Sequence, residues 1–502
     1  MELRTSGFAG EPKLPSGRYV PCTRAASMWL ARSACGPALW SLARKEASMN
    51  QRRLLSHPAV LRVALSACAT MGLAACSDDS DRNGGGAGEG GGAGEGGGAG
   101  EGGSAGEGGG AGEGGMAGVP STAGGEGGAE EGMAGAAGID RDVYRPELVP
   151  FTAARLESLQ VAEGFVIDVY AEDMQDARML ATHDGHVYLT RPMQGDVLRF
   201  VDDDSDGIAD STVTVASDMP TVHGIAFHEG TVYLATPRVL YRGSVDGAGD
   251  FQEIEPVFED LPDGGQHPLR TLGVGPDEML YISVGSSCDA CPETNPEHAT
   301  MLRAPLDGES REIFAEGLRN TIGFDWHPDT GELWGMDHGS DWRGNDLPPE
   351  ELNLLEMGND YGWPYCFGER HVDPIIGDPP DTTQEDYCED TAPSVREYQA
   401  HGAPIGMVFY DGDGFPNEYT GEAFIALHGS WNRYPPTGYK VVRLRFDGGE
   451  PTDFEDFVTG FLSDDGETQF GRPAGIVVAP DGALLFTDDA NGMVYRVSAE
   501  QD

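Results

Sequence analysis

The sequence predicts an all-β domain, a six-bladed β-propeller, preceded by a disordered linker rich in Gly, Ala and Glu. Two observations lead to this prediction, and a third indicates that the protein is exported. A pattern of alternating apolar residues around a tight turn recurs six times within residues 144–502. A Gly-Ala-Gly-Glu repeat with almost no large apolar side chains comes before it. A short apolar segment typical of an export signal comes earlier still.

Residues 49–75 have the features of a bacterial lipoprotein signal peptide. A basic start at Met49 is followed by a short apolar stretch and by Leu73-Ala-Ala-Cys76. We expect Cys76 to carry the lipid; an ordinary signal peptide with an incidental cysteine is the alternative. The apolar stretch is too short and too interrupted for a transmembrane helix. Because residues 1–48 precede a complete signal, we interpret them as a mis-assigned upstream extension, with the true start at Met49.

Residues 76–143 are expected to form a lipid-anchored, flexible, low-complexity tether. Gly, Ala and Glu recur in it with a period of six, and large apolar side chains are nearly absent before Ile139. Such a segment buries too little apolar surface to offset the entropy of ordering. We therefore expect an exported protein that is held on a bacterial membrane only by its lipid, on the periplasmic side or at the cell surface.

The six units of residues 144–502 each consist of two short strands around a turn, and most are followed by a third strand. The first four begin about 45–50 residues apart, which is the length of one propeller blade. The later intervals are longer, so the fourth and fifth blades should carry insertions. A sandwich or a β-helix would use the same strands, but neither predicts six similar units. The units begin at Met179, Gly224, Leu272, Ile322, Gly406 and Gly475.

The charge balance limits the partners of the chain. Its 32 Lys and Arg residues against 84 Asp and Glu residues give a net charge of −52. Binding to a nucleic acid needs the opposite sign, so we exclude nucleic acid as a partner. The balance favours an acidic, secreted type of surface.

Four cysteines lie in the globular part. Export permits disulfides, and proximity favours the pairs Cys288 with Cys291 and Cys366 with Cys388. A redox dithiol or half of a zinc site is the alternative for the C-x-x-C spacing. The sequence contains no C-x-x-C-H motif for a covalent haem, so a redox enzyme of this sequence would pass its electrons to another molecule.

Polar and basic residues concentrate in three strings, in loops that leave the expected strands. Loops are where a propeller displays its functional residues. The strings carry, in order, the motifs H-x-x-R-T-L, G-L-R-N, N-D-x-P-x-E-x-L-N, Y-G-W-P-Y-C and H-G-S-W-N-R. Any one of them alone is a weak signal, but together they are specific.

With these motifs in this order, the globular part resembles the glucose/sorbosone dehydrogenase family, soluble quinoproteins that use pyrroloquinoline quinone (PQQ). The resemblance covers essentially the whole globular part and also implies a six-bladed propeller. It implies cofactor contacts at Arg319, Asn320, His338, Lys440 and Arg472.

The resemblance further implies a Ca²⁺ on the quinone, held partly by backbone carbonyls of the loop His338-Gly339-Ser340, so Gly339 and Ser340 are the expected metal ligands. A hard cation accepts such oxygen ligands readily. The glucose-oxidising branch has Gln-Gly-Pro in this loop. The present sequence follows a sorbosone-type pattern with a longer insertion.

Chemical reasoning assigns catalytic roles to two of these residues. Hydride transfer from a sugar hydroxyl or a hydrated aldehyde needs a base for the O–H proton, and a histidine suits that task, so we expect His267 to be the base. The quinone gains negative charge as it is reduced, which a cation such as Arg319 would stabilise. The alternatives are that His267 caps a strand through a backbone hydrogen bond, and that Arg319 forms an ion pair between blades.

A separate acidic loop has oxygen-bearing side chains at every second position. Asp202, Asp204, Asp206 and Asp210 have the spacing of a calcium-binding loop, but Val213 occupies the place of the last EF-hand ligand. A weak structural Ca²⁺ site and a solvated acidic turn are both open.

The expected function is that of a quinoprotein dehydrogenase. It would oxidise an aldose- or sorbosone-type sugar to a lactone or acid by hydride transfer to PQQ, and pass electrons to an external quinone or cytochrome. A calcium-dependent lactonase and a non-catalytic propeller that binds a glycan or another partner are the alternatives. A dehydrogenase should have His267, Arg319 and Lys440 facing one cavity.

Overall fold

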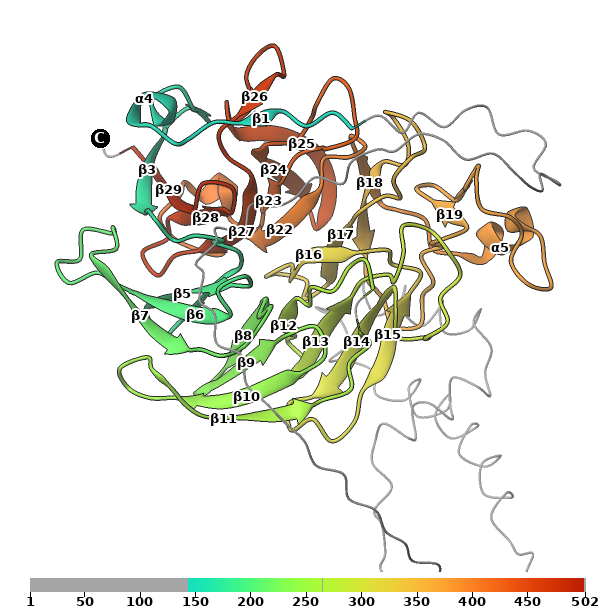
Figure 1. Ribbon diagram of the computed structural model, residues 1–502, viewed down its shortest axis with the longest axis horizontal. Coiled ribbons are helices and arrows are strands. Elements are labelled where there is room, and N and C mark those ends of the chain that lie inside the picture. Colours follow the sequence, from blue (N-terminus) through green and yellow to red (C-terminus); the bar gives the residue numbers. More distant parts are fainter. Residues whose placement is uncertain (1–142, 264, 501–502) are drawn as a thin grey trace, which may run out of the picture. The chain divides into compact units, whose positions relative to one another are not determined.

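The computed structural model describes residues 143–263 and 265–500. The predicted extension, the signal peptide, Cys76 and the tether up to residue 142 lie outside the described residues. Within the described part, six antiparallel sheets surround a common axis, one sheet for each predicted unit (Figure 1). The predicted six-bladed β-propeller is therefore confirmed.

The blades are numbered here in chain order, and each is given from its innermost strand outward. Blade 1 is β4 (Leu180–His183), β5 (His186–Arg191), β6 (Asp196–Val201) and β7 (Ser211–Ala216). Blade 2 is β8 (Gly224–His228), β9 (Thr231–Ala235), β10 (Leu240–Val245) and β11 (Phe251–Phe258). Blade 3 is β12 (Leu272–Val274), β13 (Met279–Val284), β14 (Thr300–Pro305) and β15 (Glu312–Glu316).

Blade 4 is β16 (Thr321–Trp326), β17 (Leu333–Asp337), β18 (Glu350–Leu354) and β21 (Arg396–Tyr398). Blade 5 is β22 (Pro404–Phe409), β23 (Ala423–Leu427), β24 (Lys440–Asp447) and β25 (Glu450–Thr459), with the short strand β2 (Gln160–Val161) at its outer edge. Blade 6 is β27 (Pro473–Val478), β28 (Leu484–Asp488), β29 (Met493–Ala499) and β3 (Phe165–Ala171).

The ring of blades is closed by the first and last parts of the domain. Strand β3 pairs with β29, so a strand from the start of the domain completes the final blade. Innermost strands of neighbouring blades are in contact, β4 with β8, β8 with β12, β16 with β22, β22 with β27 and β27 with β4. Blades 3 and 4 meet through β13 and β16.

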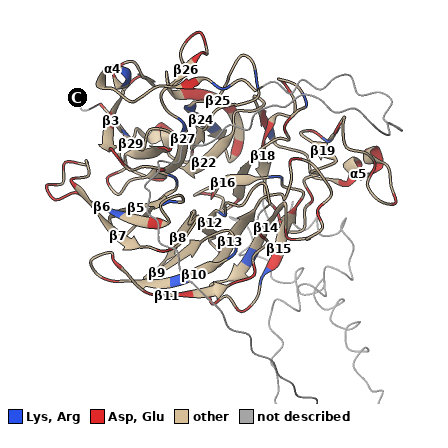
Figure 2. Cartoon of the chain, viewed as in Figure 1, with Lys and Arg blue, Asp and Glu red and all other residues tan. Residues whose placement is uncertain are grey.

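The position of a strand within its blade explains its sequence. The second strand of blade 5, Ala-Phe-Ile-Ala-Leu in β23, is buried along its whole length, because neighbouring blades cover both of its faces. The outermost strands β7 and β11 instead expose polar residues, because one edge and part of one face meet water. Acidic residues lie on outer strands and loops around the ring (Figure 2).

The predicted insertions are present. Between β18 and β21 of blade 4, the chain forms the hairpin of β19 (Cys366–Phe367) and β20 (His371–Val372) and the helix α5 (Gln384–Asp390). Both predicted disulfides form, Cys366 to Cys388 inside this insertion and Cys288 to Cys291 after β13. In blade 5, a long loop of residues 428–439 joins β23 to β24.

Few other elements are present in the described residues. They are the helix α4 (Ala153–Leu156), the 3₁₀-helix η1 (Asn417–Tyr419) and a parallel pair of β1 (Glu147–Leu148) with β26 (Thr468–Gln469). Among the described residues, no helix has the length and apolar character needed to cross a membrane.

The topology gathers the polar strings at one end of the ring. In an antiparallel blade, the start of the first strand and the end of the second lie at the same end. Arg319 and Asn320 directly precede β16, His267 lies shortly before β12, and His338 directly follows β17. Residues far apart in the sequence are thereby brought to one mouth of the propeller.

Candidate active site

A polar cavity of about 200 Å³ lies at this mouth. Five of the predicted site residues, His267, Arg319, Asn320, His338 and Gly339, line it. The remaining lining residues are Gln266, Asp341, Glu350, His401, Ala403, Trp431 and Asn432. Four of the five sequence motifs, from blades 3, 4 and 5, therefore contribute residues to one cavity.

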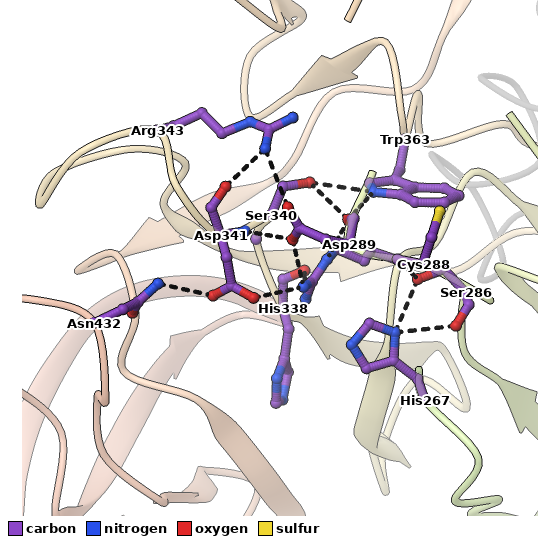
Figure 3. A network of polar contacts seen from close by, with 12 residues as sticks. His267, Ser286, Cys288, Asp289, His338, Ser340, Asp341, Arg343, Trp363 and Asn432 are labelled. Carbon is purple, nitrogen blue, oxygen red and sulfur yellow. Dashed lines mark hydrogen bonds and ion pairs between the residues drawn. The ribbon is translucent and has the colours of Figure 1, made fainter. Parts of the chain in front are cut away.

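His267 presents one ring nitrogen to this cavity and uses the other to hold its orientation. Its Nδ1 lies 3.1 Å from the carbonyl oxygen and 2.8 Å from the hydroxyl of Ser286 (Figure 3). A carbonyl oxygen only accepts, so Nδ1 carries the hydrogen and Nε2 keeps a lone pair. Burial, and then the positive charge of Arg319, lower the pKa of His267 to about 3. The imidazole is thus neutral near pH 7, the state that a general base requires.

Arg319 and Asn320 are fixed through their backbone by one buried carboxylate. The Asp337 side chain accepts hydrogen bonds from both backbone N–H groups, each at 2.9 Å, and from the Thr321 hydroxyl at 2.7 Å. Burial raises the pKa of Asp337 to about 6 in spite of these bonds. Within the described residues, the side-chain amide of Asn320 makes no hydrogen bond, so it is open to a ligand.

The loop His338-Gly339-Ser340 is held from both sides. Nε2 of His338 donates to the carbonyl of Pro404 at 2.7 Å, and burial lowers the pKa of this histidine to about 3. The Gly339 N–H donates to Glu350 at 3.1 Å. In the described part of the chain, the carbonyl oxygens of Gly339 and Ser340 accept no hydrogen bond. They therefore remain free to bind a cation.

The carboxylates near the cavity are already engaged. Glu350 also accepts the Ala403 N–H at 2.8 Å, and burial raises its pKa to about 7. Asp341 contacts an Arg319 nitrogen at 3.2 Å and accepts from the Asn432 side chain at 3.0 Å. The cavity wall thus combines the ion-paired guanidinium of Arg319, the neutral imidazoles of His267 and His338, and the side-chain amide of Asn320, which has no hydrogen-bond partner in the described residues.

The position of Lys440 does not support its predicted contact with a cofactor. Lys440 begins β24, the third strand of blade 5, and its Nζ lies 2.6 Å from Asp456 of the outer strand β25. A third strand lies further from the propeller axis than the first two, so this ammonium group does not line the polar cavity. Of the three residues expected to face one cavity, His267 and Arg319 do so and Lys440 does not.

Arg472 lies at the correct end of blade 6 but in a neighbouring cluster. Its guanidinium donates to the carbonyls of His428 at 3.1 Å and Gly429 at 2.9 Å. His428 in turn lies 2.8 Å from Asp489, which also pairs with Arg178. This cluster is adjacent in the fold, but Arg472 is not among the residues that line the polar cavity.

Several residues of the site carried no recognisable sequence signal. Ser286 and Asp289 lie next to the C-x-x-C spacing of Cys288 and Cys291, for which the sequence favours a disulfide and indicates no role for its neighbours. Asp341 directly follows the loop His338-Gly339-Ser340, and Asn432 lies within the motif H-G-S-W-N-R, but the sequence assigned neither of them a role. His401 lies shortly before β22, in an irregular loop. The only signal that could have predicted it is that residues just before a first strand lie at the mouth of the propeller.

The acidic loop after β6 forms a compact group. Oxygen atoms of Asp202, Asp204 and Asp210 lie within 4.8 Å of one another, the arrangement expected of a cation site. Asp206, which was also predicted for this site, is not part of the group, and its carboxylate accepts the Ile208 N–H at 2.9 Å. The loop sits at the far end of blade 1 from the polar cavity.

A larger cavity, of about 350 Å³, lies beside this loop between blades 1 and 6. Tyr170, Arg199, Asp481 and Arg496 line it, together with Asp202. It contains none of the predicted catalytic or cofactor residues. The smaller polar cavity is therefore the better candidate for the active site, because the base and the cofactor loops meet there.

Comparisons with known proteins identify the family of the chain. Residues 159–500 match the TrAA12-like family. An uncharacterized protein of Borreliella burgdorferi is 33% identical over 304 residues, which cover 57% of this chain and 78% of that protein. A pyrroloquinoline quinone-dependent sugar dehydrogenase of Hypocrea jecorina is 24% identical over 349 residues, covering 58% of this chain and 77% of that enzyme.

Two solved structures share the fold. The calcium structure of a Trichoderma reesei Carbohydrate-Active Enzymes Family AA12 protein has a TM-score of 0.60 at 20% identity and covers 68% of this chain and 97% of its own. The holo form of the pyranose dehydrogenase PQQ domain from Coprinopsis cinerea has a TM-score of 0.57 at 20% identity, with the same coverage of 68% and 97%. From the match over residues 159–500, we conclude that the chain belongs to the TrAA12-like family.

Proposed function

We propose that the protein is a PQQ-dependent dehydrogenase that oxidises a sugar of the aldose or sorbosone type to a lactone or acid. The observation that carries this proposal is the placement of His267, whose Nδ1 contacts Ser286 and which lines the same cavity as Arg319 and Asn320. Two relatives, from Hypocrea jecorina and Coprinopsis cinerea, are named as quinone-dependent sugar and pyranose dehydrogenases. The proposed activity agrees with the activities named for these relatives and with the residues that line the cavity.

The residues of the cavity fit an anionic quinone with a bound cation. Arg319 and the open amide of Asn320 offer donors to carboxylate and carbonyl oxygens, and Trp431 adds an aromatic wall. The carbonyl of Gly339, which lines the cavity, and that of the adjacent Ser340, which does not, are the hard oxygen ligands proposed for Ca²⁺. When bound, the quinone would supply the two-electron acceptor for the hydride.

The chain itself supplies binding and proton transfer. Nε2 of His267 would take the proton of the sugar hydroxyl, while the Ser286 oxygens hold the ring in that tautomer. Arg319 would stabilise the negative charge that develops on the acceptor. The electrons would then pass to an external acceptor.

The engaged carboxylates favour this chemistry over the lactonase alternative. A calcium-dependent hydrolase needs several side-chain carboxylates directed at one metal-bound water. Within residues 143–263 and 265–500, three such ligands converge at Asp202, Asp204 and Asp210, at the other end of the propeller. We propose a structural Ca²⁺ for that loop.

Reconstitution of the full chain tests the function. The protein, loaded with PQQ and Ca²⁺, is mixed with an artificial redox dye and a panel of aldoses and deoxy sugars. Dye reduction that requires both the quinone and a particular sugar is the expected result. Absence of quinone binding in a titration followed by absorbance would overturn the proposal and favour a non-catalytic, glycan-binding propeller.

We also propose that the enzyme is exported and anchored through a lipid on Cys76. The support is the sequence Leu73-Ala-Ala-Cys76 after a basic and apolar segment. In a bacterial host, the parent protein should fractionate with membranes and incorporate labelled palmitate. Cys76→Ser should abolish both, and membrane association that persists in this variant would contradict the anchor.

A further inference from the structure

The four-residue disulfide loop from Cys288 to Cys291 lies between the base and the cofactor loop. On one side, the Ser286 hydroxyl donates to the Cys288 carbonyl at 2.7 Å and contacts His267 at 2.8 Å. On the other side, Asp289 reaches the residues of blade 4 (Figure 3). This short cross-linked turn therefore contacts both the residues that orient His267 and the residues of blade 4.

Asp289 binds Arg319 twice, through different atoms. Its carboxylate lies 2.9 Å from Nη2 of Arg319, and its backbone carbonyl accepts from Nε of the same guanidinium at 2.9 Å. Two bonds to one planar group fix its orientation as well as its position. The Arg319 side chain is only 5% exposed, so these bonds are shielded from water.

Asp289 also holds the loop that follows His338. The carboxylate oxygen that binds Arg319 accepts the Asp341 N–H at 2.7 Å. The backbone carbonyl of Asp289 lies 3.4 Å from the Ser340 hydroxyl and accepts from the Trp363 indole at 3.3 Å. The other carboxylate oxygen lies 3.3 Å from Arg343. Asp289 therefore holds both Arg319, the expected cofactor contact, and the loop that contains the expected metal ligands.

The cross-link gives this anchor its rigidity. Cys288 and Cys291 are three residues apart and bonded, with a Cα–Cα distance of 6.2 Å, so the two residues between them have little conformational freedom. Sequence alone assigns this pair a structural role. Its contacts place it beside the reacting groups.

We propose that Asp289 is a positioning residue, which from within the Cys288–Cys291 loop orients Arg319 and residues 340–341 for the quinone and its cation. The inference rests on the proposed function, because the quinone is the ligand that these groups would contact. It assigns Asp289 no contact with the substrate. Its effect is exerted through Arg319 and the 340–341 backbone.

Variants of the full chain test this role by quinone affinity. Asp289→Ala removes the carboxylate, and Asp289→Asn keeps an oxygen for the Asp341 N–H but removes the ion pair. We expect Asp289→Ala to weaken PQQ binding, titrated by absorbance in the presence of Ca²⁺, by about 10- to 100-fold, the range for loss of an outer-shell partner in metal sites. Asp289→Asn should recover part of that loss.

A second measurement does not depend on the quinone. Hydrogen exchange followed by mass spectrometry reports the Asp341 N–H, which bonds to Asp289. In Asp289→Ala without quinone, a peptide that contains residue 341 should exchange faster, whereas peptides of blades 1 and 2 should not. If the parent fails to bind PQQ but this difference appears, the proposed function fails and the positioning of the loop stands.

Matched controls separate positioning from stability. Asp260→Ala removes a carboxylate that pairs with Arg311 on an exposed surface, and should leave PQQ affinity unchanged. The pair Cys288→Ser with Cys291→Ser should weaken PQQ binding, whereas Cys366→Ser with Cys388→Ser should lower the melting temperature without that effect. Parent-like PQQ affinity and exchange in folded Asp289→Ala would overturn the proposal.

Discussion

Nδ1 of His267 lies 2.8 Å from the hydroxyl of Ser286, and this contact, together with that to the Ser286 carbonyl, leaves Nε2 for the polar cavity. The Ser286 hydroxyl donates onward to the Cys288 carbonyl, so it accepts from His267 rather than donating to it. The base is therefore oriented by neutral oxygens and not by a carboxylate.

Ser286→Ala should lower turnover by about tenfold, since the Ser286 carbonyl at 3.1 Å remains as a weaker partner for Nδ1. The measurement is steady-state dye reduction at saturating quinone, and KM for the sugar should change little. Ser287→Ala is the matched control, because the Ser287 hydroxyl contacts Glu293 instead of His267. Equal losses in both variants would argue against the orienting role of Ser286.

The pH dependence of the reaction follows from the environment of His267. Burial and the Arg319 charge lower the pKa of His267 to about 3, and a general base works only when unprotonated. Falling pH should therefore reduce kcat/KM only well below the ordinary imidazole pKa of about 6.5. A pH profile of the parent enzyme at saturating quinone checks this. The pKa values of Asp337 and Glu350, about 6 and about 7, lie close to 6.5 as well, so an acid limb there that persists in both Asp337→Asn and Glu350→Gln would contradict the assignment.

Gly285 should not tolerate a larger side chain. A Cβ at this position would lie 2.5 Å from Cβ of His267 and 2.6 Å from Oδ1 of Asn320. Gly285→Ala must displace both, at a stability cost of about 1–3 kcal/mol, and should reduce turnover strongly. Gly377→Ala, where a Cβ meets no atom within 4 Å, is the control for chemical denaturation and dye reduction. Parent-like turnover in Gly285→Ala would show that the site is less closely packed.

The acidic loop of blade 1 should bind Ca²⁺ weakly. About 10 mM Ca²⁺ should raise the melting temperature of the parent protein by a few degrees, since weak extracellular sites bind in the range of about 0.1–1 mM. Asp204→Asn should diminish this rise, because Asp204 belongs to the group of three carboxylates. Asp206→Asn makes the same charge change outside the group and should preserve it. An identical response in the two variants would identify a solvated acidic turn.

The blades were predictable because the pattern of apolar and polar residues in each strand is a local property of the sequence. The run Ala-Phe-Ile-Ala-Leu in β23 and the polar pattern of β11 reflect their distance from the axis, which local sequence encodes. His267, Arg319 and His338 were predictable because they occupy loops next to first or second strands, and their motifs resemble a known family.

The failures of prediction concern how distant parts of the chain meet. Lys440 belongs to the family-like string and lies opposite Leu427 at the mouth end of blade 5, but nothing local shows that the start of a third strand lies far from the propeller axis. Asp289 was not predicted, because its role depends on contacts between distant segments of the chain. Its contacts to Arg319, Asp341 and Trp363 join segments up to 74 residues apart, and no spacing in the sequence reports them.

The role of His267 is tested most directly by single-turnover reduction of bound PQQ. Parent protein and His267→Gln, both saturated with PQQ and Ca²⁺, are mixed with excess sugar, and quinone reduction is followed by absorbance. The variant should bind the quinone as the parent does but reduce it about 10²- to 10⁴-fold more slowly, the usual contribution of a general base. Reduction at the parental rate in His267→Gln would contradict the assignment of His267 as the base.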